Sequence, residues 1–268
     1  MNTLSIEPNP SITYGVRYQD EHLLVIEKPP KVPTQPGKGH LGDTLLNGLF
    51  EHFGNQLQNL GKQRDFGLLH RLDKDTSGLL IVGLRTAAYD KLRDMFLQRT
   101  VKKFYWAICG AVPKHESDVI RLPIAEGHGA AANNAGTLKL AHISRHGKLA
   151  VTAYRVLDKS DMASLLECRP VTGRLHQIRI HLEAIGCPIL GDRFYGPRRV
   201  HGSSPRLALH AHRLAFAHPI TGQMIDIRTD WPGDLRRTLR NFGLHRPGTK
   251  PEPTVPQGIE IEGESGAD

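Results

Sequence analysis

The sequence is poor in cysteine and in long apolar runs, and each shortage excludes a class of protein. Only three of the 268 residues are cysteine, and their spacing fits neither a disulfide framework nor a zinc site. We expect Cys109, Cys168 and Cys187 to be buried free thiols in a reducing, cytoplasmic compartment. No apolar run approaches the roughly 20 residues that span a bilayer, so no membrane partner is expected. The first ten residues lack the basic start and apolar segment of a secretory signal.

Acidic residues are also outnumbered. The chain has 35 lysines and arginines against 27 aspartates and glutamates, a formal net charge of +8. This excess favours a polyanionic partner, which a basic protein attracts over a distance and binds with release of counterions. Charge alone does not identify that partner, because many basic proteins bind no nucleic acid.

The length of 268 residues allows one large domain or two small ones, and we expect one domain over residues 12–246. We expect a short extension at 1–11 and a disordered tail at 247–268, where proline, glycine and glutamate are frequent and aromatics are absent. The periodicity predicts the following elements: two strands within 12–29, helices at 43–60 and 86–98, a buried strand at 79–82, a strand before Gly110, a loop at 126–137, a strand pair within 138–157, a helix from His176 to Gly186, and a closing hairpin within 207–227.

Residues 66–83 hold the first stretch with chemical potential, because its polar middle lies between two apolar runs. A loop that enters a buried strand can hold side chains rigidly at a site. Asp73 has Arg71 and Lys74 beside it, and nearby cations favour an ionised carboxylate. Such a group can act as a nucleophile or a general base. The residues alone leave a second interpretation open, in which Asp73, Asp75 and Thr76 only cap a turn.

Two further stretches carry candidate groups. Tyr105 follows a basic segment, and its ring could stack on a base or its phenol exchange a proton, although a core tyrosine is the ordinary interpretation. Arg174, His176, Arg179 and His181 crowd the start of the third predicted helix, where they could hold a phosphate or a carboxylate. The alternatives are a solvated basic face and a metal site that also uses His210 and His212, whose spacing matches no familiar ligand pattern.

Three motifs together resemble the RluA-type pseudouridine synthases, which isomerise uridine in structured RNA. The first is His-Arg-Leu-Asp-Lys-Asp-Thr-Ser-Gly-Leu at 70–79. The second is Lys-Phe-Tyr-Trp-Ala-Ile-Cys-Gly at 103–110. The third is Thr-Gly-Arg-Leu-His-Gln-Ile-Arg-Ile-His at 172–181, followed by the stretch that ends at Gly196. The resemblance extends over about residues 12–240, and the motifs occur in the family's order.

The resemblance implies a mixed α/β (α+β) domain with a mostly antiparallel central sheet, flanking helices and a cleft between two halves. It implies Asp73 as the catalytic carboxylate, Arg179 as its partner, and Tyr105 as the ring that packs on the target base. It also implies substrate contacts for His70, Arg71, Lys103, Arg174 and His176. The expected partner is ribosomal or transfer RNA, and the expected enzyme is a monomer without a metal or cofactor. Relatives often carry an accessory RNA-binding domain at the N-terminus, which we expect to be missing here.

Two other functions compete with this one. A non-catalytic RNA-binding or ribosome-assembly protein on the same fold would explain the charge and the third motif. It would not explain why Asp73 is present together with its two expected partners, Tyr105 and Arg179. The run Asp73-Lys-Asp-Thr76 also fits the short D-x-D-x-T pattern of haloacid-dehalogenase-type phosphatases. There the nucleophilic aspartate follows an apolar strand, whereas here the apolar strand comes after it.

Overall fold

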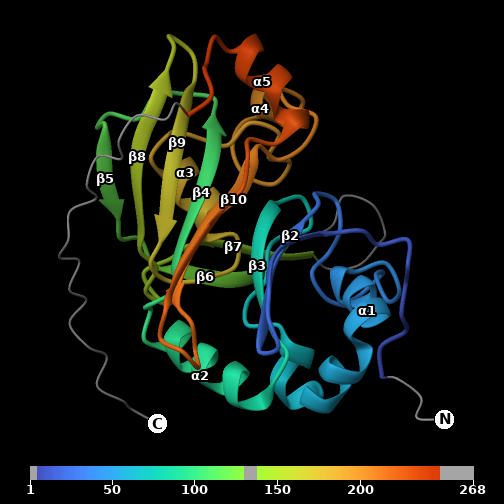
Figure 1. Ribbon diagram of the computed structural model, residues 1–268. Helices are drawn as coiled ribbons and strands as arrows, with labels where there is room; N and C mark the ends of the chain where they lie inside the picture. Colours follow the sequence, from blue (N-terminus) through green and yellow to red (C-terminus); the bar gives the residue numbers. More distant parts are fainter. Residues whose placement is uncertain (1–4, 130–137, 248–268) are drawn as a thin grey trace.

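The computed structural model describes residues 5–129 and 138–247, so most of the predicted 126–137 loop and the tail beyond Pro247 lie outside it. Its main feature is a nine-stranded sheet with helices around it, which confirms the predicted mixed α/β fold (Figure 1). All but one of the strand pairings in this sheet are antiparallel. In spatial order the strands are β1 (Gly15–Gln19), β2 (Leu23–Lys28), β3 (Ser77–Gly83), β10 (Leu209–Ala217), β4 (Lys102–Cys109), β9 (Ser164–Pro170), β8 (Thr152–Lys159) and β5 (Ser117–Ile120), with β11 (Met224–Arg228) beside β10.

The two halves of the sheet meet through a short parallel contact between β3 and β10. Only two register pairs form it, Ser77 with His210 and Gly78 with Ala211. Gly78 has φ +117°, and a Cβ at this position would lie 2.2 Å from the Ala211 carbonyl oxygen. Only glycine fits such a close backbone approach. Gly78 of the first motif therefore permits the junction of the two halves, next to the segment that carries Asp73.

The predicted helices are present with small shifts of their ends. Helix α1 (Leu45–Leu60) begins at Thr44, which forms a capping box with Asn47. Helix α2 (Thr86–Leu97) has Arg85 at its N-cap. Helix α3 (Gln177–Ala184) ends before Gly186, as expected. The structure adds α4 (Arg198–His201), α5 (Arg236–Asn241) and the short 3-10 helices η1 (Lys62–Gly67) and η2 (Gly233–Leu235).

Two predictions about the middle of the chain were wrong. Residues 126–129 do not start a loop, because they belong to β6 (Ile124–Gly129), which pairs with β7 (Leu138–Ile143). The strands predicted within 138–157 exist as β7 and β8 but do not pair with each other, since β8 lies between β5 and β9. The β6–β7 hairpin is held by backbone pairing, in which glycine can take part as well as other residues. Its buried Ile124 and Ala141 pack with Ile180 of α3.

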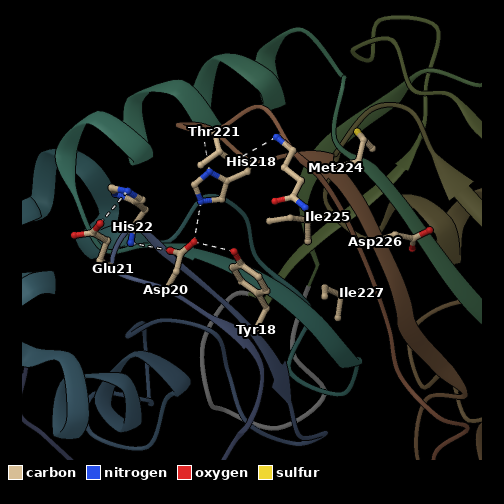
Figure 2. Close-up of a pocket in the computed structure, with 11 residues that line it drawn as sticks. Tyr18, Asp20, Glu21, His22, His218, Thr221, Met224, Ile225, Asp226 and Ile227 are labelled. Atoms are coloured by element: carbon tan, nitrogen blue, oxygen red, sulfur yellow. Dashed lines mark hydrogen bonds and ion pairs between the residues drawn. The ribbon is translucent and has the colours of Figure 1, made fainter.

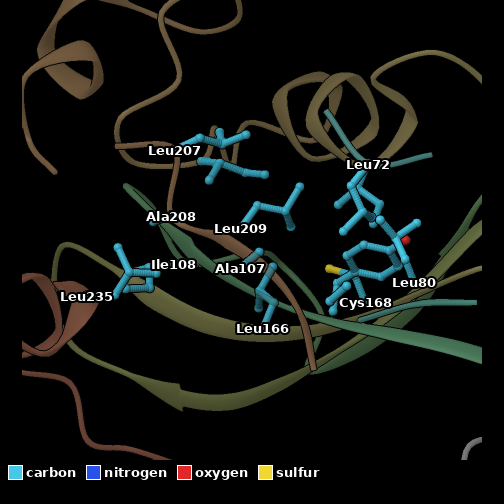
Figure 3. Packing of buried hydrophobic residues seen from close by; sticks show 14 of the residues in the cluster. Leu72, Leu80, Ala107, Ile108, Leu166, Cys168, Leu207, Ala208, Leu209 and Leu235 are labelled. Carbon is cyan, nitrogen blue, oxygen red and sulfur yellow. The ribbon is translucent and has the colours of Figure 1, made fainter. Parts of the chain in front are cut away.

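The core places the Asp73 segment firmly against the sheet. Leu72, beside Asp73, is buried in the same cluster as Leu80 of β3, Cys168 of β9 and Leu209 of β10 (Figure 3).

All three cysteines are buried free thiols, as predicted. Among the described residues, no helix combines the length and apolarity needed to cross a bilayer.

Candidate active site

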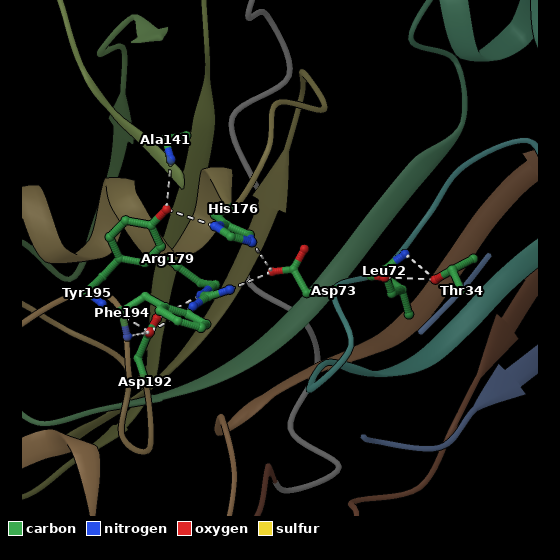
Figure 4. A network of polar contacts seen from close by, with 9 residues as sticks. All are labelled: Thr34, Leu72, Asp73, Ala141, His176, Arg179, Asp192, Phe194 and Tyr195. Carbon is green, nitrogen blue, oxygen red and sulfur yellow. Dashed lines mark hydrogen bonds and ion pairs between the residues drawn. The ribbon is translucent and has the colours of Figure 1, made fainter. Parts of the chain in front are cut away.

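Asp73 and Arg179 meet across the junction between the two halves of the sheet. Asp73 lies in the loop before β3, and Arg179 lies in α3, 106 residues further along the chain. The Arg179 Nη1 donates to Asp73 Oδ2 at 3.0 Å (Figure 4). The Asp73 side chain remains 24% exposed, whereas that of Arg179 is 5% exposed. The pair therefore presents an accessible carboxylate on a buried cation.

Asp192 fixes the orientation of Arg179. Both Asp192 carboxylate oxygens accept from the guanidinium at 2.8 Å, and Oδ1 also accepts the backbone amides of Phe194 and Tyr195. The guanidinium lies over the rings of Phe194 and Tyr195 at 5.4 and 5.0 Å. Burial alone would lower the pKa of Arg179, but the hydrogen bonds and charges of Asp192, and then of Asp73, raise it above its ordinary value. Arg179 thus stays charged. Its Nε and Nη2 are bound to Asp192, and its Nη1 donates to Asp73.

His176 forms a second contact beside Asp73. It caps α3 in a left-handed conformation, with φ 53°, which turns its ring toward the site. Its Nε2 lies 3.9 Å from Asp73 Oδ2, and its Nδ1 is 2.8 Å from the Tyr195 hydroxyl. That hydroxyl accepts the Ala141 amide. If it donates its proton to Nδ1, the neutral ring presents an N–H to Asp73. Burial lowers the pKa of His176 against the opposing charge of Asp73, which favours the neutral form.

Tyr105 lies in β4, next to β9 and β10, and is almost completely buried. Burial raises its pKa far above the usual value, and the negative charge of Asp73 raises it further. The phenol is therefore protonated at neutral pH. A proton-accepting role would require it to pass its own proton on, whereas stacking on a base requires no such step.

The other predicted substrate-binding residues occupy different environments. Arg71 is exposed, and its charge acts on His176, so it lies near the mouth of the site. Lys103 lies over Phe96 at 5.6 Å, and burial lowers its pKa to about 8. Arg174 Nε donates to the Leu149 carbonyl, which ties it to the backbone. His70 Nε2 accepts the Ile81 amide at 3.1 Å, and burial lowers its pKa to about 3, so this ring is neutral and supports β3.

The histidines considered as metal ligands are held apart by protein partners. His181 bonds Thr152 and the Leu122 carbonyl, and His210 lies between Ser77 and Thr229. His212 bonds Glu167. Among residues 5–129 and 138–247, no group of three or more side chains of the usual ligand types could hold a metal ion.

Sequence reasoning missed Asp192 and Tyr195 as members of the site. Asp192 is the only acidic residue between positions 184 and 225, a signal that could have marked it as a partner for a buried arginine. Tyr195 gives no comparable signal, because its contacts to His176 and Ala141 depend on the tertiary fold.

A cavity of about 470 Å³ lies elsewhere, between the β1–β2 turn and the β10–β11 turn (Figure 2). Asp20 in its wall accepts from Tyr18, from His218 Nε2 and from two backbone amides. These polar groups are satisfied within the protein, and the cavity shares no residue with the Asp73 site.

The geometry disfavours the phosphatase interpretation. Asp73 precedes the buried strand β3, whereas the nucleophile of that pattern follows its strand. Asp73 also faces a buried arginine rather than further carboxylates that would share a divalent cation.

Comparison with known proteins agrees with this geometry. Residues 22–184 match the family model described as RNA pseudouridylate synthase. The chain is 37% identical to an uncharacterised RNA pseudouridine synthase of Bacillus subtilis over 85% of this chain and 72% of that protein. It is also 37% identical to the ribosomal large subunit pseudouridine synthase D of Zymomonas mobilis, over 84% of this chain and 71% of that protein.

Solved structures show the same likeness. The structure of human RNA pseudouridylate synthase domain containing 4 superposes with a TM-score of 0.66 and 28% identity, over 87% of this chain and 95% of that one. The matched region contains Asp73, Tyr105 and Arg179, all within residues 22–184. The chain belongs to the RNA pseudouridylate synthase family.

Proposed function

We propose that this RNA pseudouridine synthase isomerises one or more uridines in ribosomal RNA, or alternatively in transfer RNA, with Asp73 as its catalytic carboxylate. The ion pair between Asp73 and Arg179 is the observation that carries the assignment. It combines an accessible carboxylate with a buried cation that two further hydrogen bonds hold in place. Relatives named for the large ribosomal subunit favour ribosomal RNA as the first substrate to test.

The reaction breaks the bond between ribose C1′ and uracil N1, turns the base, and joins C1′ to C5. A proton leaves C5 and one is gained at N1, so the product is an isomer and no redox cofactor is required. Asp73 would act at the sugar–base junction, and Arg179 would keep it ionised and aimed. A uridine in a stem or loop has to leave its stack before Asp73 can reach it.

Tyr105 would support the detached base. Base–aromatic stacking contributes about 1–3 kcal/mol, and a protonated phenol offers such a face without adding charge beside Asp73. Arg71 is exposed near the mouth and would contact RNA phosphate or fill the space that the flipped nucleotide leaves. Asp73, Tyr105 and Arg179 all come from one chain, which supports a monomer as the working unit.

The test compares pseudouridine in ribosomal and transfer RNA from cells with and without the protein. Carbodiimide labelling with a primer-extension readout locates each site. We expect one or a few sites to disappear and to return with wild type but not with Asp73→Asn. Asp75→Asn serves as the matched control, because it makes the same change two residues away, outside the contacts of Arg179. Restoration of the sites by Asp73→Asn would remove Asp73 from the chemistry.

A further inference from the structure

A proline-rich loop between β2 and α1 lies against the segment that carries Asp73. Thr34 of this loop is only 3% exposed. The Thr34 hydroxyl donates to the Leu72 carbonyl at 2.8 Å and accepts the Leu72 amide at 3.2 Å. Figure 4 shows this pair of contacts immediately beside Asp73. One hydroxyl therefore satisfies both backbone groups of the residue before the proposed catalytic carboxylate.

The strand that leads into this loop also holds the residue after Asp73. Lys28, which is completely buried at the end of β2, donates to the Lys74 carbonyl at 3.1 Å. Its other two contacts are the carbonyls of Pro29 and Val32, inside the loop. The backbone on both sides of Asp73 is thus fixed by side chains of one neighbouring segment.

The loop is itself anchored to a rigid element. The carbonyls of Pro33 and Thr34 accept the first amides of α1, from Leu45 and Leu46, at 2.8 and 3.1 Å. These amides have no partner within the helix, so the loop satisfies groups that a helix start leaves open. A continuous series of contacts therefore runs from α1 through Thr34 to Leu72 and Asp73.

We propose that Thr34 is a positioning residue for Asp73, whose hydroxyl sets the placement of the carboxylate relative to the bound nucleotide. The proposal rests on the function proposed above for Asp73. Among the described residues, the hydrogen bond and ion pairs of the Asp73 side chain involve Arg179 and His176 alone, so its backbone determines where it can reach. A displacement of about 1 Å at a reacting group can slow a reaction by about a hundredfold.

Thr34→Val tests the proposal, because valine keeps the shape of threonine and removes the hydroxyl. We expect the single-turnover rate at saturating RNA to fall by about ten- to a hundredfold, with RNA affinity within about twofold of wild type. Thr34→Ser restores the hydroxyl and should recover the rate to within about threefold. Thr238→Val is the matched control, since it removes a buried hydroxyl of α5 that bonds Ser204, and it should leave the rate unchanged.

Hydrogen exchange of the Leu72 amide reports the same contact without catalysis and should accelerate in Thr34→Val but not in Thr34→Ser. If Thr34→Val does not fold, Thr34→Ala removes the hydroxyl without introducing new atoms and serves the same comparison. A wild-type rate in the hydroxyl-free variant, or a serine variant as slow as valine, would overturn the proposal. An active Asp73→Asn enzyme would instead overturn the proposed function, whatever the result at Thr34.

Discussion

At the scale of single residues, the two aspartates around Arg179 have different environments. Asp192 is 1% exposed and accepts four hydrogen bonds, two from the guanidinium and two from backbone amides. Asp73 accepts one hydrogen bond from Arg179 and keeps part of its surface free. The satisfied carboxylate of Asp192 holds the arginine, and the accessible carboxylate of Asp73 has the free surface that its proposed catalytic role requires.

Asp192→Asn should destabilise the protein strongly. The variant leaves a buried guanidinium without its main counter-charge, and loss of one partner of a buried pair costs about 3–5 kcal/mol. Urea unfolding measures the change. Asp226→Asn is the control, because Asp226 is 40% exposed where it pairs with Arg213, and an exposed pair contributes about 0–1 kcal/mol. Equal losses in the two variants would contradict the special role of Asp192.

Lys28 should make stability depend on pH. Burial lowers its pKa from 10.5 to about 7, against the opposing charges of Asp73 and Asp75. Between about pH 7 and pH 10 the unfolded chain therefore binds more protons than the folded one. The free energy of unfolding contributed by this group rises with pH across that window, by at most about 1.4 kcal/mol per pH unit. Urea unfolding of wild type and of Lys28→Met at two pH values measures this contribution. The same change in the free energy of unfolding with pH in both proteins would contradict the prediction.

The sequence allowed prediction of the residues whose chemistry is visible in a motif, but not of those that act through geometry. Asp73, Tyr105 and Arg179 could be named from three motifs, and the structure brings Arg179 onto Asp73. Asp192 was missed although its isolation among non-acidic residues was a usable signal. Thr34 could not be assigned, because its hydroxyl gains its partners only when distant segments meet.

At the scale of elements, periodicity identified the strands and helices themselves better than it identified which strands pair with one another. The strands β7 and β8 were expected, yet each pairs with a different strand from the one predicted. Alternation shows which residues face a core, whereas the partner of a strand depends on the path of the whole chain. Helix α5 was missed because it is only six residues long, and its place depends on Leu239 packing in the core.

The β6–β7 hairpin should loosen in Tyr195→Phe. The Tyr195 hydroxyl is the acceptor for the Ala141 amide of β7 and the partner of His176 Nδ1. Phenylalanine keeps the ring beside Arg179 but leaves both groups unpaired, at a cost of about 1–3 kcal/mol for each buried group. Hydrogen exchange should show faster exchange at Ala141 with little change in β2. Unchanged protection at Ala141 would show that the hairpin does not depend on this contact.

At the scale of the whole molecule, the net charge of +8 predicts RNA binding that weakens with salt. Arg71→Ala should lower affinity and reduce the slope of log affinity against log salt by about 1, if Arg71 contacts a phosphate. Filter binding over a salt series measures both quantities. Arg17→Ala is the control, since Arg17 of β1 is already paired with Glu27 of β2. The same slope change in both variants would mean that general charge, not a contact at the site, is responsible.

The separation of Asp73 and Arg179 along the chain has a consequence for biosynthesis. One partner belongs to the segment that builds β1 to β3, and the other appears 106 residues later. A nascent or truncated chain that has completed only the first half holds the carboxylate without its cation. Contacts between such distant segments form late, after the entropy of closing the chain has been overcome. If Asp73 is the catalytic carboxylate proposed above, competence to modify RNA is acquired only when these two distant segments have met.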